Sequence, residues 1–385
     1  MGHRFHHGSR QSFKISTRDT AKIMLNSKPS YSLRQLVLYA LKLGAIGFGG
    51  PVALVGYMLR DLVEKRKWIS EADYKEGLTL AQLAPGPLAA QLAIYLGYVD
   101  YHILGATLVG LAFVLPSFVM VVILGWAYKI YGGLSWMQAV FYGVGAAVIG
   151  IIAYSAYNLT TKTIGKNKLL WAIYIGLAAF TAATESENIY LILFSGLLVW
   201  FVENPPFRTK SASGLASFFI LPVAIGTAVS KSAALWGIFT FFAKAGTFVF
   251  GSGLAIVPFL YGGVVKEHHW LTDHQFLDAV AVAMITPGPV VITVGFIGYL
   301  VAGFPGACVA ALGTFLPCYL FTIIPAPYFK KYGKTPALLS FVNGITAAAI
   351  GAITGAVIVL GRKSIADIPT ALLAIGSAIG LWKTK

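Results

Sequence analysis

Long apolar stretches alternate with short polar segments along most of the chain, without the residue-by-residue alternation that is typical of strands. The apolar stretches lie at about residues 33–59, 78–99, 103–129, 137–160, 169–184 and 189–202, and again at about 215–229, 233–262, 277–300, 304–327, 337–360 and 368–382. Several approach the roughly 20 residues that a helix needs to cross a bilayer. The pattern therefore predicts an all-α polytopic membrane protein, a helical bundle and not a barrel.

The second series of apolar stretches repeats the first. Residues 42–87 align without gaps with residues 244–289, and the match continues after a shift of one residue. The repeated residues are Lys42, Gly44, Phe48, Gly49, Trp68, Pro85, Gly86 and Pro87, which recur as Lys244, Gly246, Phe250, Gly251, Trp270, Pro287, Gly288 and Pro289. We therefore expect two homologous halves, an arrangement that many secondary transporters share. The predicted parts are a tail over residues 1–32, a first membrane domain over 33–202, a linker over 203–214 and a second membrane domain over 215–385.

Basic residues are unequally distributed between equivalent loops. The loop after the first repeated segment contains Arg60, Lys65, Arg66, Lys67 and Lys75, whereas its counterpart contains Lys266 alone. Because Lys and Arg accumulate on the cytoplasmic side, equivalent loops are expected on opposite faces, as in an inverted repeat.

This topology places the N-terminus inside the cell, and Glu185 and Glu187 outside. It requires residues 33–59 to enter the membrane and return, which predicts broken or re-entrant helices. Arg362 and Lys363 are an exception, because the topology places these basic residues outside.

Helix-breaking residues occur at equivalent places in both halves. The first break contains Gly47, Gly49 and Gly50, and its counterpart contains Gly251, Ser252 and Gly253. The second break contains Pro85, Gly86 and Pro87, and its counterpart contains Thr286, Pro287, Gly288 and Pro289. A helix that starts after such a break directs free N–H groups and a partial positive charge at the gap. Each break alone reads as a kink or a close helix crossing, but four in symmetric register favour an anion-binding site.

Two repeated lysines stand just before the glycine-rich breaks, within apolar runs. A lysine at the centre of a bilayer costs about 2.5–3.5 kcal/mol on insertion scales, so its presence at two matching positions suggests a function. Lys42 and Lys244 are therefore candidates for the positive charge of a substrate site. The alternative is that both side chains extend to an interface.

Acidic residues are almost absent from the apolar stretches. Glu76 is matched by Asp278 just before the Pro-Gly-Pro segments, and both are candidates for proton coupling. The alternative for this pair is an interfacial acid near the start of a helix.

The composition excludes several classes of function. Hydrophobic residues make up 57% of the 385 residues and charged residues only 11%, against about 25% in soluble proteins, so a water-soluble enzyme is excluded. Cys308 and Cys318 lie in one apolar stretch and predict no redox pair, and no metal site or cofactor is expected. The net charge of +15 reflects topology and predicts a lipid bilayer rather than nucleic acid as partner. A homodimer remains open.

Together these motifs resemble the chromate ion transporter family in its long, two-domain form. The resemblance rests on Phe48-Gly-Gly-Pro51, Lys67-Trp-Ile-Ser-Glu71, Gln82-Leu-Ala-Pro-Gly-Pro87, Trp270-Leu-Thr-Asp273 and Thr286-Pro-Gly-Pro289, and it extends from about Leu36 to Gly361. It implies export of chromate across the bacterial cytoplasmic membrane, driven by the proton gradient or the membrane potential, and hence chromate resistance. It also implies oppositely oriented halves and sulfate as a related oxyanion. One departure is Ser252, which stands where the family pattern has glycine.

Other functions stay open at this point. A transporter of sulfate or of another oxyanion would have the same architecture, and a passive anion channel would share the apolar segments. A membrane-embedded reductase or transferase is disfavoured, because the chain has no dinucleotide fingerprint and no matched acidic or histidine constellation.

Overall fold

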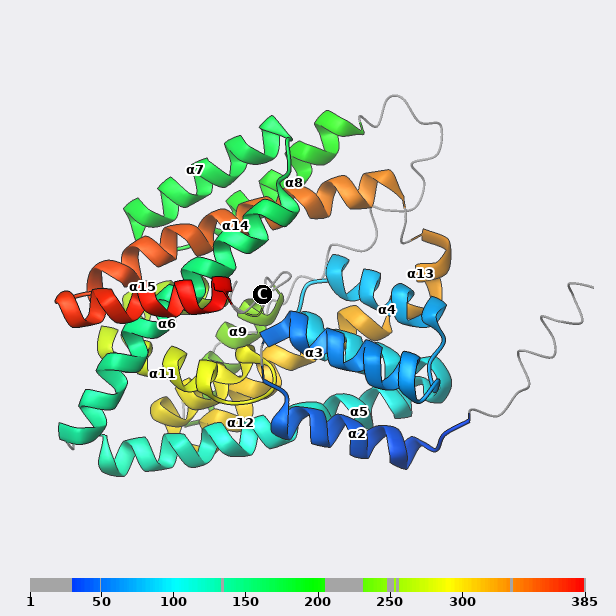
Figure 1. Cartoon of the computed structure of the whole chain (residues 1–385), viewed down its shortest axis with the longest axis horizontal. Coiled ribbons are helices and arrows are strands. Elements are labelled where there is room, and N and C mark those ends of the chain that lie inside the picture. Colours follow the sequence, from blue (N-terminus) through cyan, green and yellow to red (C-terminus); the bar gives the residue numbers. More distant parts are fainter. Residues whose placement is uncertain are drawn as a thin grey trace, which may run out of the picture.

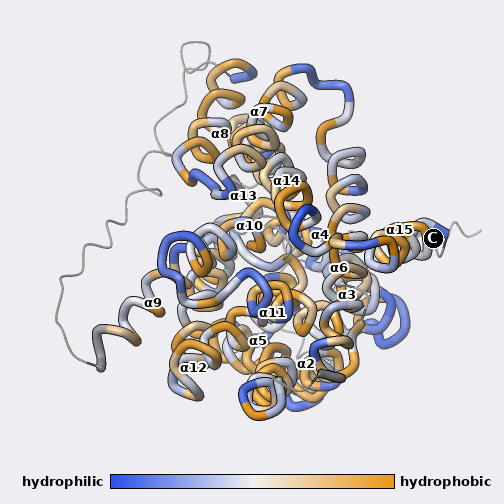
Figure 2. The backbone as a smooth tube through the Cα atoms, turned by 90° about the vertical axis from the view of Figure 1, so that its left-hand side faces the viewer, coloured by the Kyte–Doolittle hydropathy of each residue, from blue (hydrophilic) through white to orange (hydrophobic). Residues whose placement is uncertain are grey.

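The computed structural model describes residues 30–48, 50–132, 135–204, 231–247, 253, 256–332 and 335–383, and every regular element in these ranges is a helix (Figure 1). Four helices are long and apolar enough to cross a membrane, namely Leu88–Tyr131, Met137–Thr161, Val290–Phe329 and Pro336–Ser364. Apolar residues continue along most of the tube in Figure 2. The prediction of an all-helical polytopic membrane protein is therefore confirmed.

Apart from α8, η5 and α13, the described elements of the two halves follow one another in the same order. The first half contains α2 (Leu33–Ile46), α3 (Gly50–Met58), the π-helical η1 (Leu59–Lys65), α4 (Glu71–Leu83), α5 (Leu88–Tyr131), α6 (Ser135–Thr163), α7 (Lys168–Thr184) and α8 (Ile189–Glu203). The second contains α9 (Lys231–Thr247), α10 (Ile256–Leu260), the π-helical η4 (Tyr261–Glu267), α11 (Asp273–Ile285), the 3-10 turn η5 (Val290–Ile292), α12 (Thr293–Ile323), α13 (Ala326–Tyr332), α14 (Pro336–Ser364) and α15 (Ile368–Lys383).

Each glycine or Pro-Gly-Pro break in the first half is the tip of a helical hairpin. Beyond the first break, the chain returns along α2, so that Tyr39 Oη donates to the carbonyl of Tyr57 over 3.2 Å. Beyond the second break, α5 returns along α4, and Tyr95 Oη donates to Glu76 Oε1 over 2.7 Å. The apolar stretch at 33–59 is thus two helices that fold back on each other, and the stretch at 78–99 contains the end of α4 and the start of α5.

The long helix α5 contains a sharp turn of its own. His102 has φ 50° and ψ −141°, values outside the helical region, and the chain reverses there. Gly97 and Gly105 face each other across the turn, and a Cβ on Gly97 would lie 2.5 Å from the carbonyl oxygen of Gly105. The absence of side chains at these two glycines lets the backbones touch. Residues 103–131 then form one uninterrupted helix of roughly 40 Å, long enough for a membrane.

The second half repeats these contacts. The ring of Phe241 in α9 stacks on that of Phe259 in α10 at 5.3 Å, and Thr293 Oγ1 donates to the carbonyl of Ala279 over 3.2 Å. The turn at Gly303 corresponds to that at His102. The close crossings correspond too: a Cβ on Gly44 would overlap the carbonyl oxygen of Phe113, and a Cβ on Gly246 would overlap that of Thr314.

The C-terminal helices of the two halves are exchanged. Helix α7 of the first half packs on α14 of the second, where a Cβ on Gly355 would lie 2.6 Å from the carbonyl oxygen of Ala178. Helix α15 packs on α6, and Ser377 Oγ donates to the carbonyl of Ala147 over 2.8 Å. Figure 1 shows α7 and α8 beside α14, and α15 beside α6. The domain boundaries stay a prediction, because residues 1–29 and 205–230 lie outside the described ranges.

The buried core has two main parts, and the outer surface is apolar. One part is formed by the hairpins of the first half and is joined by Ala326 and Phe329. The other is formed by the hairpins of the second half and includes Ile149 and Ile152 of α6. Large apolar side chains such as Leu111 (63% exposed) and Leu372 (65% exposed) cover the outside, as expected where lipid replaces water.

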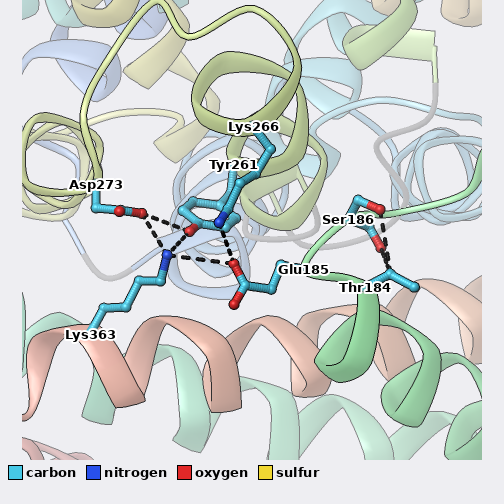
Figure 3. Close-up of polar contacts among 7 residues, drawn as sticks. All are labelled: Thr184, Glu185, Ser186, Tyr261, Lys266, Asp273 and Lys363. Atoms are coloured by element: carbon cyan, nitrogen blue, oxygen red, sulfur yellow. Dashed lines mark hydrogen bonds and ion pairs between the residues drawn. The ribbon is translucent and has the colours of Figure 1, made fainter.

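Figure 3 shows charged side chains that join four elements, α7, η4, α11 and α14, in a group that we call the Lys363 cluster. Its members are Glu185, Tyr261, Lys266, Asp273 and Lys363. Lys363 Nζ lies 2.8 Å from Asp273 Oδ1 and 3.5 Å from Glu185 Oε2. Lys266 Nζ lies 2.6 Å from the same Glu185 oxygen, and Tyr261 Oη donates to Asp273 over 2.7 Å.

The Lys363 cluster gives the exceptional lysine of the loop pattern a structural role. The loops of Glu185 and Lys266, which the charge pattern assigns to one face, do lie together with Lys363. The hydrogen bond from Lys266 holds the pKa of the Glu185 carboxyl below its usual value. Burial raises the pKa of Asp273, but the hydrogen bonds from Lys363 and Tyr261 outweigh burial and leave this pKa below its usual value.

We predict that Lys363→Met lowers the free energy of unfolding at pH 7 by about 1 kcal/mol, because two carboxylates lose a shared partner. Carboxyl groups with a lowered pKa in the folded chain stabilise it above their usual pKa, and this stabilisation is lost as the pH falls through the lowered values. The difference from the wild type should therefore shrink as the pH falls below the usual carboxyl range, measured by thermal unfolding in detergent.

The matched control is Lys75→Met, which removes a pair with Glu71 whose side chains are 71% and 69% exposed. Equal loss of stability in both variants would contradict a special role of the Lys363 cluster.

Candidate functional site

The tips of the hairpins from the two halves meet inside the bundle. The backbone N–H of Gly288 donates to the carbonyl of Gly47 over 2.9 Å, so a break of each half is joined directly. Next to this bond, Ser117 Oγ donates to the carbonyl of Gly44 over 3.1 Å. Gly253 lies against the same tip, because a Cβ there would be 2.9 Å from Val291 Cγ2.

Each of the two Pro-Gly-Pro tips contacts a helix of the opposite half. A Cβ on Gly86 would lie 2.9 Å from Cys318 Sγ of the second half, and a Cβ on Gly288 would overlap Ser117 Oγ of the first. Ser117 and Cys318 are themselves equivalent, since each follows a repeated Leu-Pro pair. The two tips are therefore related like the two sides of a pseudo-two-fold axis.

The local sequence explains the shape of both tips. Helix α4 ends at Leu83 and α11 ends at Ile285, because the prolines that follow cannot continue a helix. Gly86 has φ 142° and Gly288 has φ 94°, values that side chains disfavour. The helical turns that start after Pro87 and Pro289 contain no acidic residue. Their partial positive charge is therefore not offset by a carboxylate within the turn.

Two polar residues at the tips were not found by the sequence analysis. Gln91 is fully buried and donates through Nε2 to the carbonyl of Pro85 over 2.8 Å, while its Oε1 has no hydrogen-bond partner among the described residues. Ser117 is also fully buried. Both residues could have been noticed as polar residues inside apolar runs. The repeat did not draw attention to them, because Ile292 stands at the position equivalent to Gln91 and Cys318 at the position equivalent to Ser117.

The structure places the remaining break residues as follows. Gly50 has φ 73°, and a Cβ added to it would meet nothing within 4 Å. Thr286 is buried and caps its own helix by donating to the carbonyl of Val282 over 2.6 Å. Gly49, Gly251 and Ser252 lie outside the described residues.

Lys42 and Lys244 do not share the burial of the tips. Both side chains are exposed, and neither ammonium forms a hydrogen bond or ion pair with another described residue. Helix α2 buries Leu36, Tyr39, Ala40, Leu43 and Gly44, so Lys42 lies on its exposed face. Their assignment to a substrate site stays a prediction.

The two acidic candidates each bind a tyrosine. Glu76 accepts from Tyr95, and Asp278 accepts from Tyr128 Oη over 2.6 Å. All four side chains are wholly or partly shielded from solvent. An acid that binds a tyrosine in this way can hold or release a proton without leaving its hydrogen bond.

A cavity of about 380 Å³ lies beside Tyr128 and contains one cationic lining residue, Lys129. Its lining residues are Tyr128, Lys129, Gly132, Trp270, Leu271, Gln275 and Leu300. The cavity therefore brings the end of α5 next to the start of α11.

The described residues offer no group of three or more His, Cys, Asp or Glu side chains that could hold a metal ion. The ring of His268 instead stacks on Trp270 at 4.5 Å.

Helices broken inside an apolar bundle, in two repeated halves, define a multi-pass membrane protein of the transporter class. The family model described as "Chromate transporter" matches residues 34–200 and 236–385, in two segments that correspond to the two halves. The chain belongs to the chromate transporter family, a family of transporters and not of enzymes.

Similar proteins carry related descriptions. The chain is 69% identical over 369 residues to a "Chromate transport protein" of Cupriavidus metallidurans, covering 95% of this chain and 92% of the relative. It is 65% identical to a "Probable chromate transport protein" of Synechococcus elongatus, covering 94% and 92% of the two chains. A "Chromate transport protein" of Pseudomonas aeruginosa is 32% identical, covering 93% and 89%. No solved structure matches the chain.

We predict that Gly288→Ala abolishes transport and lowers stability, because the added methyl overlaps Ser117 Oγ and the residue keeps a positive φ. The backbone term alone costs roughly 1–2 kcal/mol. The measurement is substrate flux in proteoliposomes together with thermal unfolding. The control is Gly176→Ala in α7, where a Cβ meets nothing within 4 Å. Unchanged flux in the Gly288 variant would show that the tip tolerates displacement.

Proposed function

We propose that the protein exports chromate across the bacterial cytoplasmic membrane as a secondary active transporter, coupled to the proton gradient or the membrane potential. The chromate assignment is supported by the descriptions of the relatives at 69% and 65% identity. Export of chromate would confer resistance to it. The strongly basic loop with Arg60 and Lys65 to Lys67 supports a cytoplasmic N-terminus.

The two halves form an inverted repeat in this proposal. Tyr31, just before α2, stacks on Trp68 at 5.1 Å and donates to Asp100 over 2.6 Å, which supports one common end for both hairpins of the first half. The uninterrupted helix 103–131 starts near that end. At its other end, Gly132 lines the same cavity as Trp270 and Leu300 of the second half. The hairpins of the halves accordingly open toward opposite ends.

The exchanged contact of the two Pro-Gly-Pro tips is the observation that carries the proposed site. Each tip is followed by a helical turn without acidic residues and contacts a helix of the opposite half, through Cys318 at Gly86 and through Ser117 at Gly288. Backbone N–H groups there recognise charge and tetrahedral shape, which suits a small dianion. Lys42 and Lys244 add positive charge when the halves move around this point.

The hairpins enter from opposite sides and meet at their tips, which accounts for alternating access. A hairpin from each face closes the path from its own side, and movement of one hairpin opens that side alone. The N–H of Gly288 and the carbonyl of Gly47 form the contact between the halves around which such movement takes place.

We predict that the purified protein in proteoliposomes carries labelled chromate at a rate that an imposed pH gradient or membrane potential raises. Gradient-dependent flux that resists excess sulfate supports a coupled chromate transporter. Flux that modest sulfate abolishes means that chromate travels on a sulfate-type carrier. Flux that ignores both driving forces identifies a passive anion channel and contradicts the coupling.

We also predict that Lys42→Ala and Lys244→Ala each lower chromate flux at least tenfold without changing membrane insertion, because the dianion loses a cation near its path. The assay is the same flux measurement, normalised to inserted protein. Lys75→Ala is the control, since Lys75 pairs with Glu71 at the surface. Wild-type flux in both variants would remove the lysines from the site.

A further inference from the structure

We propose that Tyr95 and Tyr128 are positioning residues for the proton-accepting carboxylates, and that both hydroxyls come from α5 of the first half, on opposite sides of the turn at His102. The proposal rests on the proposed coupling of transport to protons. Tyr95 Oη donates to Glu76 over 2.7 Å, and Tyr128 Oη donates to Asp278 over 2.6 Å. Glu76 and Asp278 are repeat equivalents.

The two tyrosines are not repeat equivalents. By the spacing of 201 residues that holds after the Pro-Gly-Pro segments, the counterpart of Tyr95 is Phe296 and the counterpart of Tyr128 is Phe329. Each carboxylate therefore has a tyrosine partner from the first half, and both equivalent positions of the second half hold a phenylalanine.

Phe296 lies where a hydroxyl could replace that of Tyr128, and the repeat predicts the same of Phe329 for Tyr95. The rings of Phe296 and Tyr128 are 5.6 Å apart and meet edge to face, so Phe296 stands beside the Asp278 site. Phe329 belongs to the same buried core as Tyr95, on α13, which packs on the helix of Glu76. At the Asp278 site the hydroxyl thus stands on the ring next to the repeat-equivalent one, and the repeat predicts the same relation between Tyr95 and Phe329 at the Glu76 site.

The origin of the partners differs between the two sites. Tyr95 belongs to the same hairpin as Glu76, so the first site lies within one half. Tyr128 belongs to α5 of the first half and Asp278 to α11 of the second, 150 residues apart in sequence. The second carboxylate is thus tied across the interface between the halves, which gives its protonation a direct effect on their contact.

The chemistry of the pair follows from the donor. A tyrosine hydroxyl that donates to a carboxylate stabilises its charged form and fixes its orientation. When the carboxylate takes a proton, that donation weakens, and the contact between α5 and α11 loosens. Proton binding at Asp278 is in this way linked to movement of the second half against the first.

Other ionisable groups surround the two sites. Near Asp278 these are His274 on α11 and Lys129 on α5, while α6 and α12 contribute the rings of Phe141 and Phe296 around Tyr128. Lys363 of α14 and Lys266 of η4 belong to the Lys363 cluster at the start of α11.

Near Glu76 the other ionisable groups are Asp73 on α4 and Tyr98 on α5. Lys75 is paired with Glu71.

The experiment measures the pH dependence of gradient-driven chromate flux for Tyr128→Phe and Tyr95→Phe in proteoliposomes. Loss of the donor raises the proton affinity of the carboxylate, so the midpoint of the profile should move to higher pH by roughly one unit. The decisive variants return the hydroxyl from the neighbouring ring: Tyr128→Phe with Phe296→Tyr, and Tyr95→Phe with Phe329→Tyr. These double variants should restore the midpoint to within about 0.3 units and restore most of the flux.

The matched control is Tyr142→Phe, which removes a tyrosine–aspartate bond of 2.6 Å to Asp367 at the exposed side of the bundle. It should leave the midpoint unchanged. Thermal unfolding of each variant separates a loss of folding from a loss of positioning, because a purely structural tyrosine would change stability without moving the midpoint.

The outcomes distinguish the two proposals. Wild-type flux without any dependence on the gradient overturns the proposed coupling itself. Gradient-dependent wild-type flux, together with single variants whose midpoint equals that of the wild type, overturns the role of the tyrosines alone. Single variants that shift the midpoint and double variants that fail to restore it overturn the equivalence of the two ring positions.

Discussion

Inside an apolar bundle, a backbone N–H or C=O released from a helix has no water to bind and must find a partner in the protein. The breaks that the structure describes release such groups inside the bundle. The carbonyl of Gly47 receives the N–H of Gly288, the carbonyl of Gly44 receives Ser117 Oγ, and the carbonyl of Pro85 receives Gln91 Nε2. Because the N–H of Gly288 belongs to the second half, the hydrogen bond that pairs the freed carbonyl of Gly47 also joins the two halves.

The same constraint explains why the crossings are made of glycine. Hydrogen bonds between backbones of different hairpins require close approach, and the methyl of alanine at Gly44 or Gly246 would already overlap a carbonyl oxygen. Small residues therefore occur where the hairpins cross, and large apolar ones face outward. The pairing of the breaks, the glycine crossings and the apolar surface all follow from a surrounding of lipid instead of water.

Much of this architecture could be predicted from the sequence, because it depends on local rules applied twice. Proline and glycine mark the breaks, and the repeat shows which breaks correspond. The return of residues 33–59 was predicted because the N-terminal tail and the basic loop that follows this segment were both placed on the cytoplasmic side of the membrane. The partner of Asp278 could not be found in this way, because Tyr128 lies 150 residues away in the other half and its repeat counterpart is a phenylalanine. Gln91 was missed for the same reason, since Ile292 replaces it in the repeat.

The sequence pattern also could not predict which of the singled-out side chains are buried and which are exposed. A lysine in an apolar run has the same sequence signature whether it faces a partner helix or the outside, and Lys42 and Lys244 prove to be exposed. The role of Lys363 was also out of reach, because its partners Asp273 and Glu185 come from other elements. Repeats and breaks specify the backbone path, whereas pairings of side chains depend on how the two halves interlock.

The exchange of α7 and α15 has a consequence for the autonomy of each half. Helix α15 covers α6, and helix α7 covers α14. A polypeptide that contained one half alone would therefore leave the glycine-lined face of its own α6 or α14 exposed. A second polypeptide of the same kind, placed in the opposite orientation, would cover that face with its own terminal helix. The long chain therefore behaves as a covalently tethered pair, in which the connection fixes stoichiometry and lets the two members diverge, as Tyr128 and Phe329 already have.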